Sequence, residues 1–176
     1  MDFINTQIAV SDLPAAEEVT LQPVQHDYIR VLRIEWLITA VILAIIAGGL
    51  VFAIDRLRES YNWSLVAGAW LLLLIPWLIV QEKAFPFMAY AVRDKDVLYR
   101  KGWITRSVKI CPLNRIQNCT VTSGPLERRF GLSSLIIYTA GTGGADLKIP
   151  GLLHNDADRL RHFILEKIHA EEHGNG

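Results

Sequence analysis

Two long stretches of the chain carry no charged side chain, and they constrain the fold more than any other feature. The first covers residues 36–54 and the second residues 61–80, in a chain of 176 residues. As helices of 19 and 20 residues they are about 28 to 30 Å long, which matches the hydrocarbon core of a bilayer. The link of residues 55–60 is too short to cross a membrane. The sequence therefore predicts a transmembrane helical hairpin with both of its ends on one side.

Basic residues near the two stretches predict which side that is. Two lie in the link, Arg56 and Arg58, and five lie on the side of the chain ends: Arg30, Arg33, Lys83, Arg93 and Lys95. Since Lys and Arg are retained on the cytoplasmic side and acids count little, both termini are expected in the cytoplasm. The first ten residues contain no basic residue, unlike a signal peptide, so the first helix is expected to remain as an anchor.

Small residues recur at every fourth position within the stretches. Ala40, Ala44 and Gly48 form one such stripe, and Ser64 and Gly68 form another. Small side chains at this spacing let helix backbones approach closely, so they are expected to pack the hairpin together. Self-association with a second copy through Ala40, Ala44 and Gly48 is the alternative. Because neither stretch contains an ionisable side chain, an ion pump or transporter is not expected.

The chain has no net charge, with 18 Lys and Arg against 18 Asp and Glu, but its charges are unevenly placed. Residues 1–80 contain four basic and eight acidic side chains, whereas residues 81–176 contain 14 and ten. Residues 1–35 are acidic and contain two prolines, which predicts a mostly flexible tail. A continuation of the first helix through residues 27–35 is an alternative for the end of this tail.

Beyond the second stretch the apolar pattern changes from continuous to alternating, which is typical of β-strands. Residues 81–170 are enough for one small core, and residues 171–176 are expected to be a disordered end. Six strands are predicted, at residues 87–92, 97–103, 106–111, 116–122, 135–139 and 146–149. A helix follows, with Asn155 as its N-cap and an apolar face that includes Ala157 and Ile164. The predicted fold class is an antiparallel sheet or small barrel closed by a C-terminal helix.

Four short segments of this region are distinctive in their order and spacing. They are ICPLNRIQN at residues 110–118, GPLERRFGL at 124–132, YTAG at 138–141 and IPGL at 149–152. Together with the two-helix hairpin before them, they resemble the bacterial PH-like domain of the YdbS-like membrane-flanked family, in its short form. The resemblance covers about residues 85–170.

The resemblance implies a pleckstrin-homology-like barrel of seven strands, capped by a C-terminal helix, at the bacterial cytoplasmic membrane. Six strands are predicted from the pattern, so the seventh lies around residues 125–130 or is missing. Short members of the family occur beside longer relatives with several copies of the domain. A larger multi-copy relative is therefore the partner that the resemblance implies.

The strongest signal for a functional site is a surplus of basic residues directly after the hairpin. Residues 81–130 contain ten basic and four acidic side chains. A domain tethered beside an anionic leaflet gains roughly 1 kcal/mol for each base near the surface. An ordinary solvated face explains the same charges equally well, and nucleic acid is not expected, because no basic motif is interleaved with aromatic residues. The residues predicted to contact headgroups or a partner are Lys101, Arg106, Arg115, Gln117, Arg128 and Arg129.

Three other patterns favour structural roles. The glycine-rich residues 141–146 lack the Lys-Ser/Thr ending of a phosphate loop. His169 and His173 have the spacing of a metal pair but no third fixed ligand. Cys111 and Cys119 lie on the two arms of a predicted turn, where they are expected to face each other as reduced thiols. No catalytic, cofactor-binding or metal site is therefore predicted.

These observations predict a non-enzymatic membrane protein whose helical hairpin presents a PH-like domain. Its expected role is protein assembly or scaffolding at the cytoplasmic face, with contact to anionic headgroups. An accessory subunit of a membrane enzyme or transporter is the alternative, and neither the sequence pattern nor the resemblance separates the two.

Overall fold

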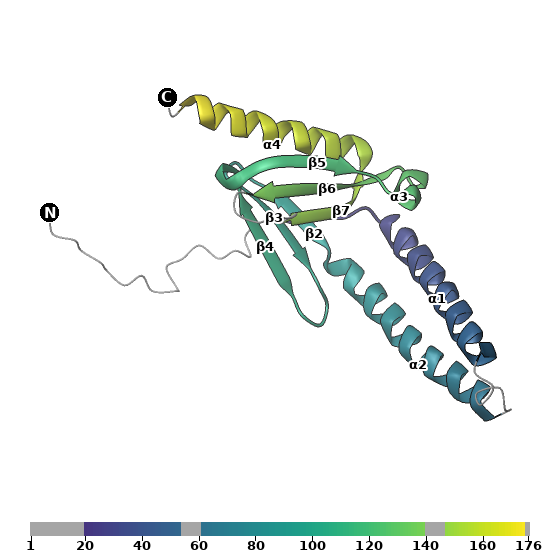
Figure 1. Cartoon of the computed structure of the whole chain (residues 1–176). Helices are drawn as coiled ribbons and strands as arrows, with labels where there is room; N and C mark the ends of the chain where they lie inside the picture. Colours follow the sequence, from purple (N-terminus) through teal and green to yellow (C-terminus); the bar gives the residue numbers. More distant parts are fainter. Residues whose placement is uncertain (1–19, 54–60, 140–146, 175–176) are drawn as a thin grey trace, which may run out of the picture.

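A computed structural model of the chain describes residues 20–53, 61–139 and 147–174. Its strands form two antiparallel sheets, in the orders β1-β2-β3-β4 and β5-β6-β7 (Figure 1). The strands of the first sheet are β1 (Gln22–Pro23), β2 (Ala89–Val92), β3 (Asp96–Lys101) and β4 (Ser107–Pro112). Those of the second are β5 (Ile116–Thr122), β6 (Leu132–Thr139) and β7 (Leu147–Leu153).

Two long helices leave this domain and a third lies across it (Figure 1). The long pair are α1 (Tyr28–Ala53) and α2 (Tyr61–Ala84), and α4 (His154–Gly174) packs over β5 and β6. Three short helical segments complete the chain: η4 (Phe85–Phe87) links α2 to β2, whereas η5 (Leu113–Arg115) and α3 (Pro125–Arg129) connect strands.

Both long helices are apolar enough to cross a membrane. The qualifying segments are Tyr28–Leu50 and Ala67–Phe87, of 23 and 21 residues. Only 11% and 6% of their most apolar windows are buried, so these are not the core helices of a soluble domain. Leu72 and Leu73 are 73% and 71% exposed, for example. The predicted apolar hairpin is therefore confirmed in length and composition, and α1 begins eight residues before the expected residue 36.

Contacts between α1 and α2 differ from those expected of the small-residue stripes. Ala40 is buried, and the Trp36 indole N–H donates to the carbonyl oxygen of Leu74 at 3.2 Å. A methyl group added at Gly48 or Gly68, however, would meet no heavy atom within 4 Å. The prediction that both stripes pack the hairpin is wrong for these two glycines, because the helices do not approach closely at them.

A two-residue strand that precedes the helices supplies the seventh strand. Gln22 pairs with Tyr90 and Pro23 with Ala89, so β1 lies on the edge of the first sheet. The expected location around residues 125–130 is wrong, since α3 occupies it. The helical hairpin is thus an insertion between the first two strands of the domain and does not merely precede it.

The segment between β1 and α1 is hydrogen-bonded to two parts of the domain, the residue before β2 and strand β7. The Val24 amide donates to the carbonyl of Met88 at 3.2 Å, and the Gln25 amide donates to that of Gly151 at 2.9 Å. Val24 and Ile29 are buried in the core cluster. The predicted flexible tail is therefore wrong for residues 20–35, and the helical alternative is confirmed from Tyr28 onward. Residues 1–19 lie outside the described part of the chain.

The core lies between the two sheets and beneath α4. Leu135, Ile137 and Ile149 from the second sheet meet Val97 from the first, and all four are fully buried. From α4, Ala157 and Ile164 are equally buried, which confirms the predicted apolar face. The expected closed barrel is wrong in one respect, because the strands form two separate sheets. The PH-like arrangement of strands and terminal helix is retained.

Strand positions agree with the six predicted strands, but β6 and β7 are longer than expected. β6 begins at Leu132 and includes Ser133 and Ser134, which are polar but fully buried. β7 continues through Pro150 and Gly151, with a change of register between Ser133 and Leu135 of β6. Hydrophobic pattern alone missed both extensions, since serine and proline do not mark a buried strand.

Three smaller expectations are corrected. α4 begins at His154, so Asn155 lies inside its first turn and does not cap it. The helix extends to Gly174, whereas a disordered end was expected from residue 171. Cys111 and Cys119 are buried and not joined by a disulfide, and they do not face each other across paired strands, because β4 and β5 belong to different sheets. The glycine-rich segment 141–146, residues 175–176 and the side chains of His169 and His173 lie outside what the structure describes.

Substitution of Gly151 tests the junction between β7 and the start of α1. A Cβ atom at Gly151, whose φ is +67°, would lie 2.6 Å from Cγ of Tyr28. Gly131→Ala is the matched control, since its φ is +66° but a Cβ there meets nothing within 4 Å. A left-handed backbone costs a non-glycine residue about 1–2 kcal/mol, and overpacking adds about 1–3 kcal/mol. Gly151→Ala is therefore expected to lower the thermal unfolding midpoint in detergent clearly further than Gly131→Ala, and equal shifts would contradict the packing.

Candidate membrane-facing site

The structure places the six predicted contact residues at three separate positions. All six side chains are exposed. Lys101 ends β3 and Arg106 lies in the turn before β4, Arg115 and Gln117 lie in η5 and β5, and Arg128 and Arg129 lie in α3. The basic surplus of residues 81–130 is therefore not one continuous patch.

The β3–β4 hairpin separates the first two positions. Its register joins Lys101 to Ser107 at the turn and Asp96 to Pro112 at the other end. At about 3.3 Å per residue, the two ends are roughly 17 Å apart. Lys101 and Arg106 thus lie at the turn, whereas Arg115 and Gln117 follow the opposite end.

The turn of this hairpin lies beside the end of α2 that joins the domain (Figure 1). The guanidinium group of Arg106 lies over the ring of Phe87, 5.6 Å from its centroid. Phe87 ends η4, which directly follows α2. A cation over an aromatic face is attracted by the ring quadrupole, so this contact holds the hairpin turn at the point where the chain leaves the membrane helix.

A carboxylate fixes α3 and its two arginines. Glu127 accepts a hydrogen bond from the Gly124 amide at 2.9 Å and another from the Ser134 hydroxyl at 2.7 Å. The first bond caps the short helix, and the second joins it to β6, where Ser134 is fully buried. Because α3 also contacts α1, Arg128 and Arg129 lie near the start of that helix.

An open groove of about 740 Å³ separates α1 from the turn between β5 and α3. Tyr28, Glu35 and Ile38 line it from α1, and Ser123, Glu127 and Lys148 are among the residues on its other wall. The lining combines both charge signs with apolar carbon, so the groove does not select one ligand chemistry.

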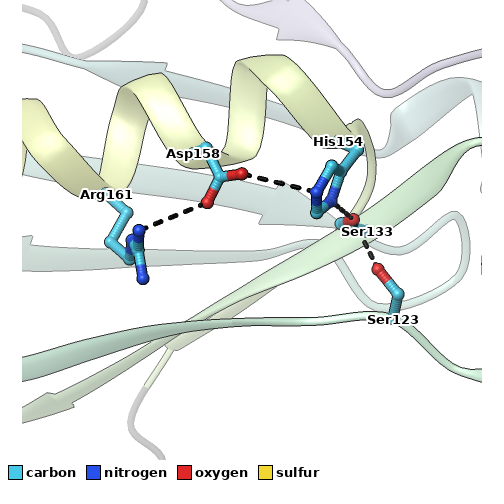
Figure 2. A network of polar contacts seen from close by, with 5 residues as sticks. All are labelled: Ser123, Ser133, His154, Asp158 and Arg161. Carbon is cyan, nitrogen blue, oxygen red and sulfur yellow. Dashed lines mark hydrogen bonds and ion pairs between the residues drawn. The ribbon is translucent and has the colours of Figure 1, made fainter.

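A chain of polar contacts joins the residue after β5 to β6 and α4 (Figure 2). The hydroxyls of Ser123 and Ser133 are 2.6 Å apart, and the Ser133 hydroxyl lies 2.9 Å from Nδ1 of His154. Nε2 of His154 lies 3.4 Å from Asp158, which also lies 3.5 Å from Arg161. The sequence did not reveal this network, since its members are adjacent only in the folded chain.

The network contains the residue types of a hydrolytic triad, but its geometry favours a structural role. Ser133 is fully buried, so a substrate does not reach its hydroxyl. The His154 amide donates to the carbonyl of Gly131 at 3.1 Å, next to these side-chain contacts. Together these bonds attach the first turn of α4 to the start of β6.

Neither thiol nor metal chemistry is favoured in the described residues. Burial raises the pKa of the Cys119 thiol, against a smaller opposite effect of Arg161, so this cysteine is held in its unreactive protonated form. Among the residues that the structure describes, no group of three or more His, Cys, Asp or Glu side chains can hold a metal ion.

Two apolar residues at the hairpin turn were not among the predicted site residues. Trp103 is 41% exposed and Ile104 is 73% exposed, between the basic Lys101 and Arg106. Their signal in the sequence was an apolar pair flanked by bases, at the boundary between a predicted strand and the turn after it. It was missed because Trp103 was assigned to the preceding strand.

The two sheets, the terminal helix and the apolar hairpin define a PH-like domain combined with a membrane anchor. The family model described as Bacterial PH domain matches residues 27–168, and the chain belongs to this family. The chain is 28% identical over 135 residues to the UPF0699 transmembrane protein YdbS of Bacillus subtilis (strain 168), a match that covers 73% of this chain and 83% of that protein. No solved structure matches the chain.

These matches confirm the resemblance. The family match begins at residue 27, directly before the helical hairpin, and so covers both the hairpin and the domain that the resemblance included. Both the inserted helices and the sheets are therefore within the matched region. The similar protein is itself described as transmembrane, which agrees with the two apolar helices of this chain.

Removing the Glu127 carboxylate tests how α3 is held. Glu127→Ala leaves the buried Ser134 hydroxyl and the Gly124 amide without this acceptor, and such a loss costs about 1–3 kcal/mol. Denaturant unfolding in detergent should show this loss, whereas the exposed Arg129→Ala should change stability by less than about 0.5 kcal/mol. If Glu127→Ala and Arg129→Ala unfold at the same denaturant concentration, the carboxylate does not secure α3.

Proposed function

We propose that this chain is a non-enzymatic, membrane-anchored PH-like domain that takes part in protein assembly at the cytoplasmic face of a bacterial inner membrane. One observation carries the proposal: the helical hairpin is inserted between β1 and β2, so both of its ends join the same sheet. A domain held by two connections has a restricted orientation above the bilayer. Such a fixed orientation suits a scaffold better than it suits a freely moving tethered module.

The proposed orientation has both termini in the cytoplasm and the chain crossing the membrane twice. Arg33 and Glu82 support it, because they form a two-bonded ion pair across α1 and α2, with Nη2 and Oε2 2.9 Å apart. The pair lies at the domain ends of the two helices. Both charges therefore lie at the same depth, outside the two uncharged stretches. Basic residues that flank such stretches favour the cytoplasmic side.

Contact with anionic headgroups is proposed for the bases that lie near the helices. Lys101 and Arg106 are at the hairpin turn beside Phe87, and Arg128 and Arg129 are on α3 beside α1. Arg115 and Gln117 follow the end of β4, at the far end of the β3–β4 hairpin from its turn. For these two residues, contact with an acidic protein partner is the better assignment.

The proposed partner is a larger relative that contains several copies of the domain. A shallow depression of about 270 Å³ beside Arg115, lined also by Lys109, Ile110 and Thr139, supports a contact at this end of the domain. Self-association is a second candidate, through the exposed Ala44 and the half-exposed Gly48. Ala40 is not available for it, since it is buried within its own chain.

Copurification tests the assembly role. The full chain, tagged and extracted from membranes with a mild detergent, is expected to retain a reproducible protein partner. Arg115→Glu should reduce the amount of that partner at least severalfold, because it places an acid against an acidic surface. Arg159→Glu is the matched control, since Arg159 is exposed on α4 and carries no proposed contact. A strictly monomeric protein with no partner, or equal recovery with both variants, would contradict the proposal.

The alternative is an accessory subunit of a membrane enzyme or transporter. It shares the anchor and the docking surface but predicts a different consequence of losing the chain. Deletion would then abolish a measurable flux or reaction of the copurified partner in reconstituted vesicles. If the partner keeps its full activity without this chain but loses its assembly state, scaffolding is the better description.

A further inference from the structure

The turn of the β3–β4 hairpin exposes two large apolar side chains, and contact of such side chains with water is unfavourable. Residues 102–105 form this turn, which we name the hairpin tip. Trp103 and Ile104 are 41% and 73% exposed at it. Gly102 has a φ of +99°, and a Cβ atom there would lie 2.0 Å from the carbonyl oxygen of Thr105. The tip is therefore a tight turn with a set shape that presents both apolar residues outward.

The register of the sheet places the tip beyond the end of α2, toward the membrane. Ala89 pairs with Arg100, so continuing β3 by two residues brings Gly102 level with Phe87. Trp103 and Ile104 extend past that level by up to about 6 Å, at 3.3 Å per residue. Figure 1 shows the hairpin pointing in the same general direction as α2.

The tip thereby reaches the depth expected of headgroups. The uncharged stretch ends at Val80, seven residues before Phe87, which is roughly 11 Å along a helix. The headgroup layer is about 5–7 Å thick on each side of the hydrocarbon core. Its outer boundary therefore lies about 4–6 Å below Phe87, which is the depth that Ile104 can reach.

The charges around the tip have the sign that an anionic bilayer attracts. Lys101 and Arg106 flank the tip, and both side chains are exposed. Among the described residues of the β3–β4 hairpin, the acidic Asp96 lies at the opposite end and is paired with Arg93. Tryptophan is favoured at the membrane–water interface, where its ring is half in an apolar environment and its N–H remains wet.

We propose that the hairpin tip inserts into the headgroup region of the cytoplasmic leaflet, as a third point of membrane contact beside α1 and α2. Trp103 and Ile104 enter the outer part of the headgroup layer, and Lys101 and Arg106 bind lipid phosphates around them. The Arg106–Phe87 contact holds the tip against the membrane end of η4. The inference rests on the proposed membrane anchoring and adds a specific lipid-binding element to it.

A bilayer is favoured over a protein as the occupant of this surface because the tip is continuous with an apolar anchor. The segment Ala67–Phe87, which is long and apolar enough to span, ends at the residue that Arg106 covers. A surface beside the end of such a span faces lipid without any partner being present. Docking of a protein on the tip is the competing outcome, and the experiment separates the two.

Fluorescence of a probe at three positions of the full chain tests the proposal. Ile104→Cys, Ile110→Cys and Leu72→Cys are each labelled with an environment-sensitive fluorophore and reconstituted without other proteins in vesicles that contain an anionic lipid. Ile110 is the matched control, because it is also exposed, on the same hairpin but six residues farther along the chain. Leu72 is the reference for lipid, and unsubstituted protein is the blank, since Cys111 and Cys119 are buried.

The expected result is a blue-shifted emission at position 104, quenched by spin-labelled lipid and protected from an aqueous quencher, with a water-like emission at position 110. Equal, water-like signals at 104 and 110, together with a lipid-like signal at 72, would overturn the tip insertion and leave the membrane anchoring intact. A water-like signal at 72 would instead reject the anchoring itself. Protection of position 104 in native membranes but not in protein-free vesicles would assign the tip to a protein partner and overturn the lipid proposal.

Discussion

The backbone pairing of residues 22–25 with the sheets is the constraint on which the rest of the structure depends. β1 pairs with β2, and the amides of Val24 and Gln25 donate to the carbonyls of Met88 and Gly151. These bonds close the chain on itself across more than sixty residues that include both apolar helices. Without them the two helices would be joined to the domain only at the end of α2, and the first sheet would lose its edge strand β1.

Several features follow from this closure. The two apolar helices start and end at one sheet, so their domain ends lie at similar depth, where Arg33 and Glu82 pair. The β3–β4 hairpin belongs to that same sheet, and its turn is therefore carried to the end of α2, where Arg106 covers Phe87. The inserted helices thus determine which loop of the domain lies beside the domain end of α2.

Much of the fold could be predicted from the sequence because its signals are local. The uncharged stretches indicate the helices, and strict alternation over residues 116–122 predicts β5 with the bounds that the structure has. β1 could not be found this way, since it has two residues and one of them is Pro23, which is tolerated there because β1 is an edge strand. Its presence depends on pairing with a strand some 65 residues away, which no local pattern reports.

The candidate site was only partly predictable, for the same reason. Counting charges proposed Lys101 and Arg106 as site residues together with Arg115, but Arg115 follows the opposite end of the β3–β4 hairpin. The Ser133–His154 contact and the role of Glu127 depend on two fully buried serines in β6 that no hydrophobic pattern marks. Membership of the Bacterial PH domain family provides the fold and the link to a transmembrane protein, whereas the positions of the individual side chains come from the pairing of strands.

Hydrogen–deuterium exchange of the segment before α1 shows whether residues 22–25 are bonded to the domain. The measurement is made on the full chain reconstituted in lipid bilayers, with the amides of Val24 and Gln25 compared with those of β2. Because both amides are hydrogen-bonded to the domain, the account predicts that they are protected to the same degree as β2. Exchange of Val24 and Gln25 at the rate of an unstructured peptide, while β2 remains protected, would contradict the inserted-hairpin fold and the fixed orientation derived from it.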